Sequence, residues 1–386
     1  MIIACIKDIL IKKYDNYQVY IHNMSGFDAI FWLKILADIG NVKLIIHHDK
    51  FISIQVSLND SILTFKDSNQ LLIGSLRKLS ISFGVDIQKS IFLYKFVNKD
   101  NLDYIGAIPD LKYFDGISSL DYNCYIENYN IWSMREETIR YCNIDCISLH
   151  QIIIKFNEIV FNLFKLNIHK YPTLSSLAFA IYRSNFLIQD TIPQISGQIS
   201  TDIRLSYTGG AVDMYIPFNK DGVKLYGYDV NSLYPFVMEE YPMPIGNPIL
   251  FEGNIRLIDY QAFWFFFCKI TSPQYLKHPI LQTHVKTPNG MRTIAPLGTW
   301  TGMVFSAEMD NAIKFGYKFE ILWGYTFQKA NVFKDYINNL YNLRLGYEKS
   351  NPLNYLAKLL LNSLYGRFGM EDNFFDISIW NLPSFQ

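Results

Sequence analysis

The chain has 386 residues, and half of them are hydrophobic. A chain of this length and composition can bury a large core and is expected to form more than one domain, which excludes an intrinsically disordered protein. The formal net charge is zero, so any affinity for nucleic acid must come from local placement of Lys and Arg rather than from an overall basic excess.

The cysteines, which lie at positions 5, 124, 142, 146 and 268, match neither a disulfide framework nor a C-x2-C metal pattern. We interpret them as reduced thiols of an intracellular protein. The longest apolar run, 262–268, is too short to span a bilayer and predicts a buried strand. No membrane association and no transit peptide are therefore expected.

The first predicted elements are a strand at Tyr17–Ile21 and a helix that starts near Asp28 and ends at Gly40. The loop between them reads His22-Asn23-Met-Ser-Gly-Phe27-Asp28, and the expected apolar face of the helix is Phe31, Ile35 and Ile39. Asp28 is thus expected at a helix N-terminus beside a strand end. That position suits either a bound cation or a plain N-cap.

Short strands are predicted at 42–46, 51–56 and 62–65, which gives a mixed α/β sheet. The capping box Ser133-Met-Arg-Glu136 predicts a long helix through about Phe161. Tyr141 and Asp145 are four residues apart on that helix and therefore share a face. A phenol and a carboxylate so placed can orient water and hold a metal against phosphate, or they can be an ordinary exposed pair.

Residues 164–205 contain Pro172, Pro193 and Gly197 and show no clean period, which is typical of a connector. In the next segment, Tyr207-Thr-Gly209-Gly210, the paired glycines allow close approach of a bulky partner or form a simple turn. From 243 to 330 the chain is aromatic and rich in predicted strands. His278 and His284 lack acidic or Cys neighbours there, so no metal site is expected.

The run 223–228 alternates as a half-buried strand does, and Asp229 follows it at a turn with Ser232 as the expected helix cap. A carboxylate at a strand end can hold a hard cation, while free N–H groups of the turn can receive phosphate oxygens. Tyr234 would present a flat ring beside them. The simpler alternative is an Asp that caps a turn.

Two helices are predicted near the end of the sequence. The first has an apolar stripe that consists of Val332, Phe333, Tyr336, Ile337, Leu340 and Tyr341. The second starts with Asn351 as cap and Pro352 at the first helical position. Lys358, Asn362 and Tyr365 fall at i, i+4 and i+7, so they share one face, and Leu359 and Leu360 pack behind them.

Two of these segments resemble family B DNA polymerases. The string from Asp229 to Pro235 is similar to the motif D-x-x-S-L-Y-P, and Lys358 to Gly366 is similar to K-x3-N-S-x-Y-G. The resemblance implies that Asp229 and the Val230 carbonyl hold metal and that Lys358 is catalytic. It further implies nucleotide contacts from Ser232, Leu233, Tyr234, Lys358, Asn362 and Tyr365, and DNA contacts from Ser363 and Gly366.

The N-terminal part is similar to the 3′-5′ exonuclease domain of the same family. H-N-x3-F-D is met by Asn23, Phe27 and Asp28, and Y-x3-D by Tyr141 and Asp145. This implies metal ligands at Asp28 and Asp145, catalysis by Tyr141, and DNA contacts at Asn23 and Phe27. The family's D-x-E before residue 22 and its D-T-D are not found in the sequence, which we interpret as truncation.

Three shorter elements resemble segments of the family, and the first two of them resemble its protein-primed branch. Ser75 and Leu76 match a segment that contacts primer and priming protein, with Ser68 as a rival anchor, and Lys89-Ser-Ile-Phe92 matches an element whose Lys helps the exonuclease. Tyr207, Gly209 and Gly210 match Y-x-G-G, which touches template DNA. The interval between Asp229 and Lys358 has the length of an insertion that grips the priming protein.

The resemblance implies α/β and α+β domains: a ribonuclease H-like exonuclease at 1–165, a connector at 166–206, and part of a right-hand polymerase at 207–386. Within the last, the insertion is expected at about 243–330 and the fingers helices at about 331–366. The expected cofactor is Mg²⁺, two ions per site, and the expected partners are template-primer DNA, dNTPs and a terminal protein.

The expected activity is DNA-directed DNA polymerisation in a monomer that replicates a linear plasmid or mobile DNA by protein priming. The heavy use of Ile, Asn, Tyr, Phe and Lys suggests an AT-rich gene, and the expected location is the mitochondrion. The alternative is an inactive fragment that only binds DNA or the terminal protein.

Overall fold

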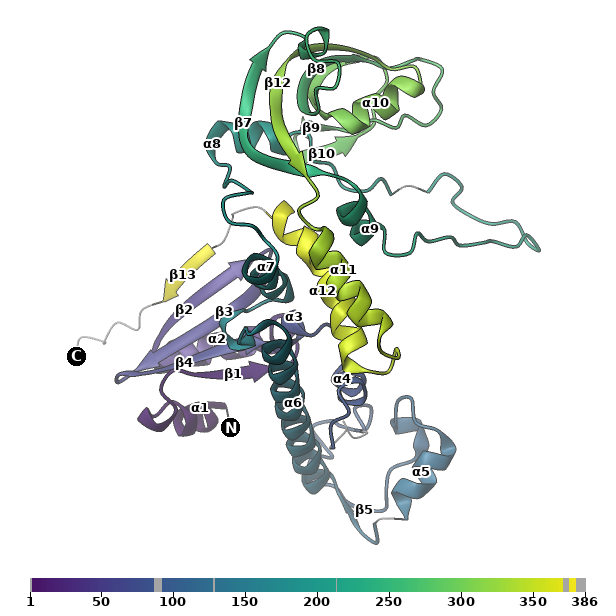
Figure 1. The fold of residues 1–386 in the computed structure, drawn as a ribbon. Coiled ribbons are helices and arrows are strands. Elements are labelled where there is room, and N and C mark those ends of the chain that lie inside the picture. The colour runs from purple at the N-terminus through teal and green to yellow at the C-terminus, as the bar shows by residue number, and fades with distance from the viewer. Residues whose placement is uncertain (1, 87–91, 128, 213, 371–374, 380–386) are drawn as a thin grey trace. The chain divides into compact units, whose positions relative to one another are not determined.

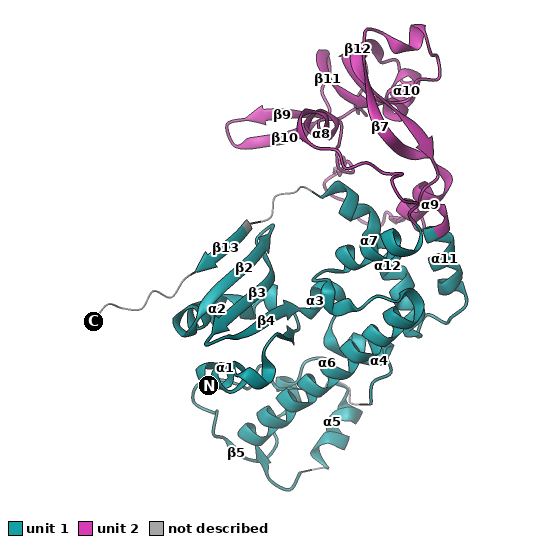
Figure 2. Cartoon of the chain, turned by 60° about the vertical axis from the view of Figure 1, so that its left-hand side comes forward, with its two compact units in different colours: residues 1–186, 336–386 teal, residues 187–335 magenta. Residues whose placement is uncertain are grey.

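The computed structural model describes residues 2–86, 92–127, 129–212, 214–370 and 375–379. The chain divides into two compact units (Figure 2). Unit 1 comprises Met1–Phe186 and Tyr336–Gln386, and unit 2 comprises Leu187–Asp335. The domain boundaries expected from sequence stay a prediction. The two compact units do not follow the predicted domain boundaries, because unit 1 combines residues 336–386 with residues 1–186.

Unit 1 is built on a five-stranded sheet with the order β1-β4-β3-β2-β13 (Figure 1). The predicted strands are confirmed in β1 (Tyr17–Ile21), β2 (Asn41–His47), β3 (Lys50–Leu58) and β4 (Ser61–Asp67). β1 runs parallel to β4, and the other pairs are antiparallel. The edge strand β13 (Phe375–Ile379), which pairs with β2, was not predicted.

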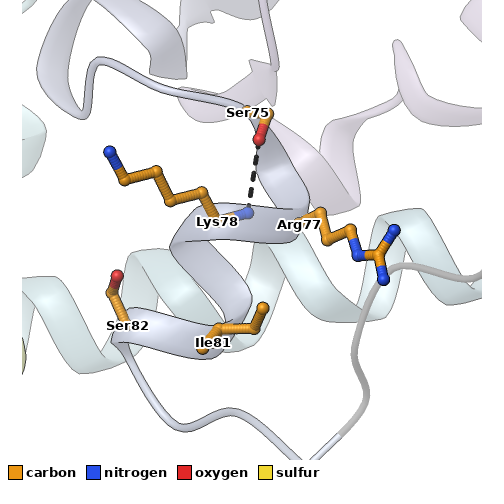
Figure 3. A pocket seen from close by; sticks show the side chains of 5 residues that line it. All are labelled: Ser75, Arg77, Lys78, Ile81 and Ser82. Carbon is orange, nitrogen blue, oxygen red and sulfur yellow. Dashed lines mark hydrogen bonds between the residues drawn. The ribbon is translucent and has the colours of Figure 1, made fainter. Parts of the chain in front are cut away.

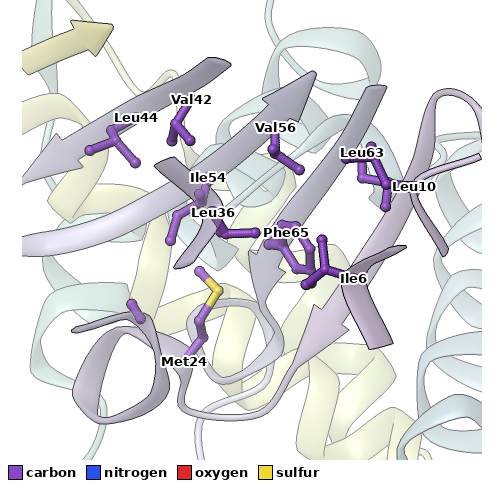
Figure 4. Packing of buried hydrophobic residues seen from close by; sticks show 11 residues of the cluster. Ile6, Leu10, Met24, Leu36, Val42, Leu44, Ile54, Val56, Leu63 and Phe65 are labelled. Carbon is purple, nitrogen blue, oxygen red and sulfur yellow. The ribbon is translucent and has the colours of Figure 1, made fainter. Parts of the chain in front are cut away.

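The core of this sheet lies against α1 (Ile2–Ile9) and α2 (Asp28–Ile39). Alternate residues of β3 and β4 point into it, among them Ile54, Val56 and Phe65 (Figure 4). The predicted apolar face of α2 is only partly right: Ile39 packs against the core, but Phe31 is exposed, and the fully buried residues are Ala29 and Leu36. Because apolar residues lie nearly all round this helix, its periodicity does not indicate which face packs.

The long helix α6 (Met134–Phe164) is confirmed, and the Ser133 hydroxyl at its N-cap accepts a hydrogen bond from Glu136 N–H at 3.4 Å. Before it lie short elements and an aromatic cluster around the buried Trp132. Those elements are α3 (Ser68–Leu71), α4 (Leu76–Ser82), β5 (Ile105–Gly106), α5 (Ser119–Ile126) and β6 (Trp132–Ser133).

The expected connector 166–206 contains two helices, α7 (Leu174–Asn185) and α8 (Gly197–Arg204). A capping box of Thr173 and Ser176 opens α7, which the apolar periodicity of this segment does not indicate. The two predicted C-terminal helices are confirmed as α11 (Lys334–Leu345) and α12 (Pro352–Gly369). In unit 1, α7 packs with α12, and Tyr336 Oη donates to Leu360 O at 3.0 Å.

Unit 2 is built on a four-stranded antiparallel sheet with the order β11-β8-β12-β7. The predicted buried strand at 262–268 is confirmed as β8, in which Trp264, Phe266, Cys268 and Ile270 are buried. Gly324 permits a close approach, since a Cβ there would lie 2.3 Å from Phe265 O. The strands are β7 (Met243–Glu252), β8 (Trp264–Thr271), β11 (Thr299–Phe305) and β12 (Lys318–Ala330).

The remaining elements of unit 2 are the helices α9 (Leu233–Glu240) and α10 (Ser306–Lys314) and a hairpin of β9 (Thr283–Thr287) and β10 (Gly290–Ile294). Single turns of 3-10 helix complete the two units: η1 (Lys12–Tyr14), η2 (Met24–Gly26), η3 (Leu111–Tyr113), η4 (Ile168–Lys170) and η5 (Ile255–Leu257).

The strand predicted at 223–228 is wrong, because this segment is an exposed loop. A strand requires a hydrogen-bonded neighbour, and none of the described strands pairs with these residues. The alternation of apolar side chains there produces no buried face.

Candidate functional site

The loop between β1 and α2 is held by one buried carboxylate. Asp67, the last residue of β4, is 2% exposed. Its Oδ1 accepts hydrogen bonds from the N–H groups of Asn23 and Asn69, and its Oδ2 accepts one from Ser25 N–H, each at 2.9 Å. Sequence reasoning missed Asp67, although an Asp at the end of a strand beside the loop could have indicated it.

Asn23, Phe27 and Asp28 take distinct positions in this loop. Asn23 is left-handed, with φ 64°, and Phe27 is 65% exposed. Asp28 is the first residue of α2 rather than its N-cap. Burial, together with the negative charge of Asp67, raises the pKa of the Asp28 carboxyl. Burial and Asp67 thus disfavour the charged form of Asp28, which a bound cation would favour.

Tyr141 and Asp145 interact on α6, as their spacing predicts. Tyr141 is buried, and its hydroxyl lies 2.6 Å from the hydroxyl of Tyr94. Burial, this hydrogen bond and the charge of Asp145 raise the pKa of the Tyr141 phenol, so the phenol is protonated at neutral pH and can donate. Tyr94 follows the predicted Lys89 element. Lys89 itself lies outside the described residues.

Ser75 opens α4, where its hydroxyl accepts from Lys78 N–H at 3.3 Å. Beside it is a shallow pocket of about 260 Å³ lined by Ser75, Arg77, Lys78, Ile81 and Ser82 (Figure 3). The Arg77 and Lys78 side chains extend from opposite sides of the helix start. Leu76 is buried and therefore anchors α4 rather than facing a ligand.

The predicted face of α12 is present. Lys358 and Asn362 are exposed and Tyr365 is 39% exposed, whereas Leu360 and its neighbours are buried. Ser363 Oγ donates to Leu359 O at 2.6 Å, which turns this hydroxyl toward its own helix. A Cβ at Gly366 would meet no atom within 4 Å, so the helix surface is open there.

In unit 2, Asp229 and Val230 lie in the exposed loop before α9, and Leu233 and Tyr234 are exposed in its first turn. The prediction that Ser232 caps the helix is wrong. Ser232 occupies the N-cap position but has φ 52° and makes no side-chain cap hydrogen bond. A capping side chain needs an extended backbone at that residue, and the left-handed turn points the hydroxyl elsewhere.

Tyr207, Gly209 and Gly210 follow α8, with Tyr207 62% exposed and open space around both glycines. His284 of β9 fixes this segment, since its Nε2 lies 2.8 Å from Tyr207 O and its Nδ1 lies 3.2 Å from Thr293 Oγ1. The buried Asp202 of α8 accepts a hydrogen bond from Tyr325 Oη at 2.7 Å. Burial, together with this hydrogen bond, raises the pKa of Tyr325 to about 12.

The polymerase-like residues fall in different units: Asp229 belongs to unit 2 and Lys358 to unit 1. Within the described ranges, no group of three or more His, Cys, Asp or Glu side chains gathers as a metal site. Across the same ranges, no helix is long and apolar enough to cross a membrane.

The chain matches the family described as DNA polymerase type B, organellar and viral, over residues 9–381. It is 40% identical to a probable DNA polymerase of Neurospora intermedia over 389 residues, which cover 95% of this chain and 40% of that protein. A probable DNA polymerase of Agaricus bitorquis is 32% identical over 388 residues, 95% of this chain and 47% of its own length. The chain thus spans less than half of these curated relatives.

Solved structures of Phi29 DNA polymerase have the same fold. The complex with primer-template DNA and incoming nucleotide substrates superposes with a TM-score of 0.61 at 20% identity, covering 95% of this chain and 62% of that one. Another Phi29 crystal form gives a TM-score of 0.62. The expected fold class, an exonuclease domain followed by part of a right-hand polymerase domain, is confirmed by this likeness.

Proposed function

The chain belongs to the organellar and viral type B DNA polymerases, and on that premise we propose that it carries the nucleotide helix and first acidic motif of a template-directed DNA polymerase, together with two motifs of its 3′-5′ exonuclease. The observation that supports this most is the face of α12. Lys358, Asn362 and Tyr365 stand on one exposed side of a helix whose opposite side is a row of buried leucines and alanine.

In the proposed reaction, a primer 3′-OH attacks the α-phosphate of a dNTP, the new P–O bond forms, and pyrophosphate leaves. The Lys358 ammonium neutralises charge on the phosphates. Asn362 and Tyr365 hold the nascent base pair, and Tyr234 contacts the sugar at the position where a ribose would carry a 2′-OH. Ser232 and Leu233 complete the nucleotide contacts, and Ser363 and Gly366 lie toward the DNA.

The residues present fit Mg²⁺ as part of a donor set. Asp229 is an exposed carboxylate next to the Val230 carbonyl, and Asp28 is an acid whose pKa is raised by burial and a neighbouring negative charge. Hard oxygen donors of this kind, completed by water and substrate phosphates, are what Mg²⁺ takes in nucleotide enzymes. Mg²⁺ bound by Asp229 and Val230, or by Asp28 and Asp145, would supply Lewis-acid stabilisation of the phosphoryl group.

For the exonuclease, Tyr141 is a neutral phenol that can donate to a phosphate or orient a water. Asn23 and Phe27 lie in the same loop as Asp28 and would contact the strand that is cut. Ser75 and the segment of Tyr207, Gly209 and Gly210 would bind primer and template, and Lys89 would assist the exonuclease. We extend the proposal to priming by a terminal protein gripped by the 243–330 region, to a monomer, and to replication of a linear plasmid or mobile DNA in mitochondria.

The test is Mg²⁺-dependent extension of a primed template by the purified chain. Lys358→Ala and Asp229→Ala should each abolish extension, whereas Lys334→Ala, which removes an exposed charge from the neighbouring α11, should not. Extension that survives Asp229→Ala would overturn the proposed role of that carboxylate.

A second candidate is a chain that binds DNA or a terminal protein without copying it. It is favoured by one fact of the sequence, which contains no D-T-D. A mobility shift with template-primer DNA in the absence of any extension would support this candidate over the polymerase.

A further inference from the structure

Two consecutive carbonyl groups in unit 1 are hydrogen-bonded to two different functional elements. Tyr355 of α12 donates its hydroxyl to Ile73 O. One residue later, His22 Nε2 lies 2.8 Å from Gly74 O. Tyr355 is one turn before Lys358 on the nucleotide helix, and His22 directly precedes Asn23 of the exonuclease loop.

The protonation of His22 follows from its two partners. A carbonyl only accepts, so Nε2 carries the proton and donates it to Gly74 O. In the neutral imidazole Nδ1 is then an acceptor, and the buried Ser68 hydroxyl lies 3.0 Å from it. Both ring nitrogens are therefore used to fix the ring against the segment 68–74.

The backbone of Gly74 is fixed by hydrogen bonds and lies close to Tyr355. Its N–H donates to Asn69 Oδ1 at 3.1 Å, its φ is +146°, and a Cβ at this position would lie 3.4 Å from Tyr355 Oη. That conformation is accessible to glycine and strained for other residues. Asn69 in turn shares the Asp67 carboxylate with Asn23 and Ser25. The segment is thus bonded to the exonuclease loop at both of its ends.

We propose that Tyr355 is a positioning residue that couples the nucleotide helix α12 to the exonuclease loop 22–28 through the Ile73 and Gly74 carbonyls. The path has few steps: Tyr355 Oη to Ile73 O, one residue of backbone, then Gly74 O to His22, whose neighbour is Asn23. A displacement of α12 along this path moves the exonuclease loop and the adjacent Ser75. The inference rests on the proposed function for its consequence in catalysis, but the coupling itself is a property of the fold.

The first experiment compares amide hydrogen exchange in the unliganded chain and in Tyr355→Phe, which removes the hydroxyl and keeps the ring. Exchange should accelerate at 73–76 and also at Asn23 and Ser25, by about fivefold, as expected for loss of one ordinary hydrogen bond. The matched control is Tyr341→Phe on the adjacent α11, where the ring is 45% exposed, and it should change neither region.

Acceleration at 73–76 with no change at Asn23 and Ser25 would overturn the proposal, because the contact would then be local. A His22→Gln variant gives an independent check. If the coupling also acts from the exonuclease loop toward α12, this variant should change the rate of amide exchange around Tyr355. An unchanged segment 351–358 in that variant would likewise contradict the coupling.

The second experiment adds template-primer DNA and the complementary dNTP. In the unmodified chain, binding at α12 should change exchange at residues 22–28, and Tyr355→Phe should reduce that change by at least half. An undiminished change in the variant would contradict the coupling. If the unmodified chain binds no DNA, the proposed function fails, and the unliganded comparison still decides the coupling.

Discussion

Two loops of this chain have the same design in sequence and different surroundings in the structure. Each follows an apolar alternating segment and leads into a helix, with a left-handed residue and an acidic residue at this junction: Asn23 precedes α2 and Asp28 is its first residue, while Asp229 and Ser232 precede α9. The first loop follows a paired strand and is fixed by Asp67. The second follows an unpaired segment, and residues 221–230 are all exposed. The residue types of a loop therefore determine which chemistry it can perform, whereas its contacts with neighbouring elements determine how rigidly it is held.

The largest effect that sharpens this comparison is expected at Asp67. Asp67→Ala leaves three backbone N–H groups without their acceptor in a buried site, which should lower the free energy of unfolding of unit 1 by about 3 kcal/mol. Exchange of the β3 and β4 amides in urea measures it. The matched change in the second loop, Asp229→Ala, should leave stability unchanged. Equal losses from the two variants would show that both loops are anchored by their acids.

The next effect compares two glycines. Gly74→Ala places a Cβ on a backbone with φ +146° and 3.4 Å from Tyr355 Oη, and should cost about 1 kcal/mol. Gly210→Ala adds a methyl group to open space and should not destabilise unit 2. Urea midpoints of the two variants give the comparison, and a larger loss from Gly210→Ala would show that its segment is more constrained than the structure indicates.

A smaller effect is expected at the left-handed residues. Ser232→Gly removes the strain of a side chain at φ 52° and should stabilise α9 by about 0.5 kcal/mol, after the entropy gained by glycine in the unfolded chain is subtracted. Asn23→Gly should gain nothing, because Asn tolerates this conformation. Helix protection measured by exchange at 233–240 tests the first variant, and Tm the second.

The smallest effect concerns pH. Folding raises the pKa of Asp28 above its usual value of 3.8, so the native state binds a proton more tightly than the unfolded state. The stability that this proton provides is present below pH 3.8 and is lost as the pH rises through the higher native pKa. Asp28→Asn should therefore raise Tm slightly at pH 7 and remove that part of the pH dependence, and a lowered Tm at pH 7 would contradict this.

The predictions that succeeded depended on local patterns. The cap formed by Asn351 and Pro352 and the i, i+4, i+7 spacing of Lys358, Asn362 and Tyr365 are fixed within a single helix, so they could be derived from adjacent residues. The strands β2 to β4 likewise form neighbouring hairpins. Alternation, capping and short turns are sufficient where the partner lies nearby in sequence.

Two failures were local, the cap at Ser232 and the exposed Phe31 of α2, but the others depended on distant partners. Residues 223–228 alternate as a half-buried strand does. This alternation does not indicate whether another strand is available to pair with them. β13 pairs with β2, although the two strands lie near opposite ends of the described chain. His284 lies within hydrogen-bonding distance of Tyr207 O, although the two residues are 77 positions apart. The role of Asp67 depends on the N–H groups of a loop that precedes it by more than one strand. No local pattern carries this information.

The helix pair α7 and α12 has a consequence for synthesis. All of unit 2 lies between these two helices in the chain, yet they pack together, and the rings of Phe186 and Tyr336, at the two junctions, are 5.5 Å apart. During translation, the apolar side of α7, with Leu177, Ile181 and Tyr182, has no α12 to cover it for on the order of ten seconds. Unit 2 can fold in that interval, whereas unit 1 cannot be completed until residues 336–386 have been synthesised. A nascent chain whose translation stops within unit 2 therefore exposes the apolar side of α7, which α12 covers in the folded protein.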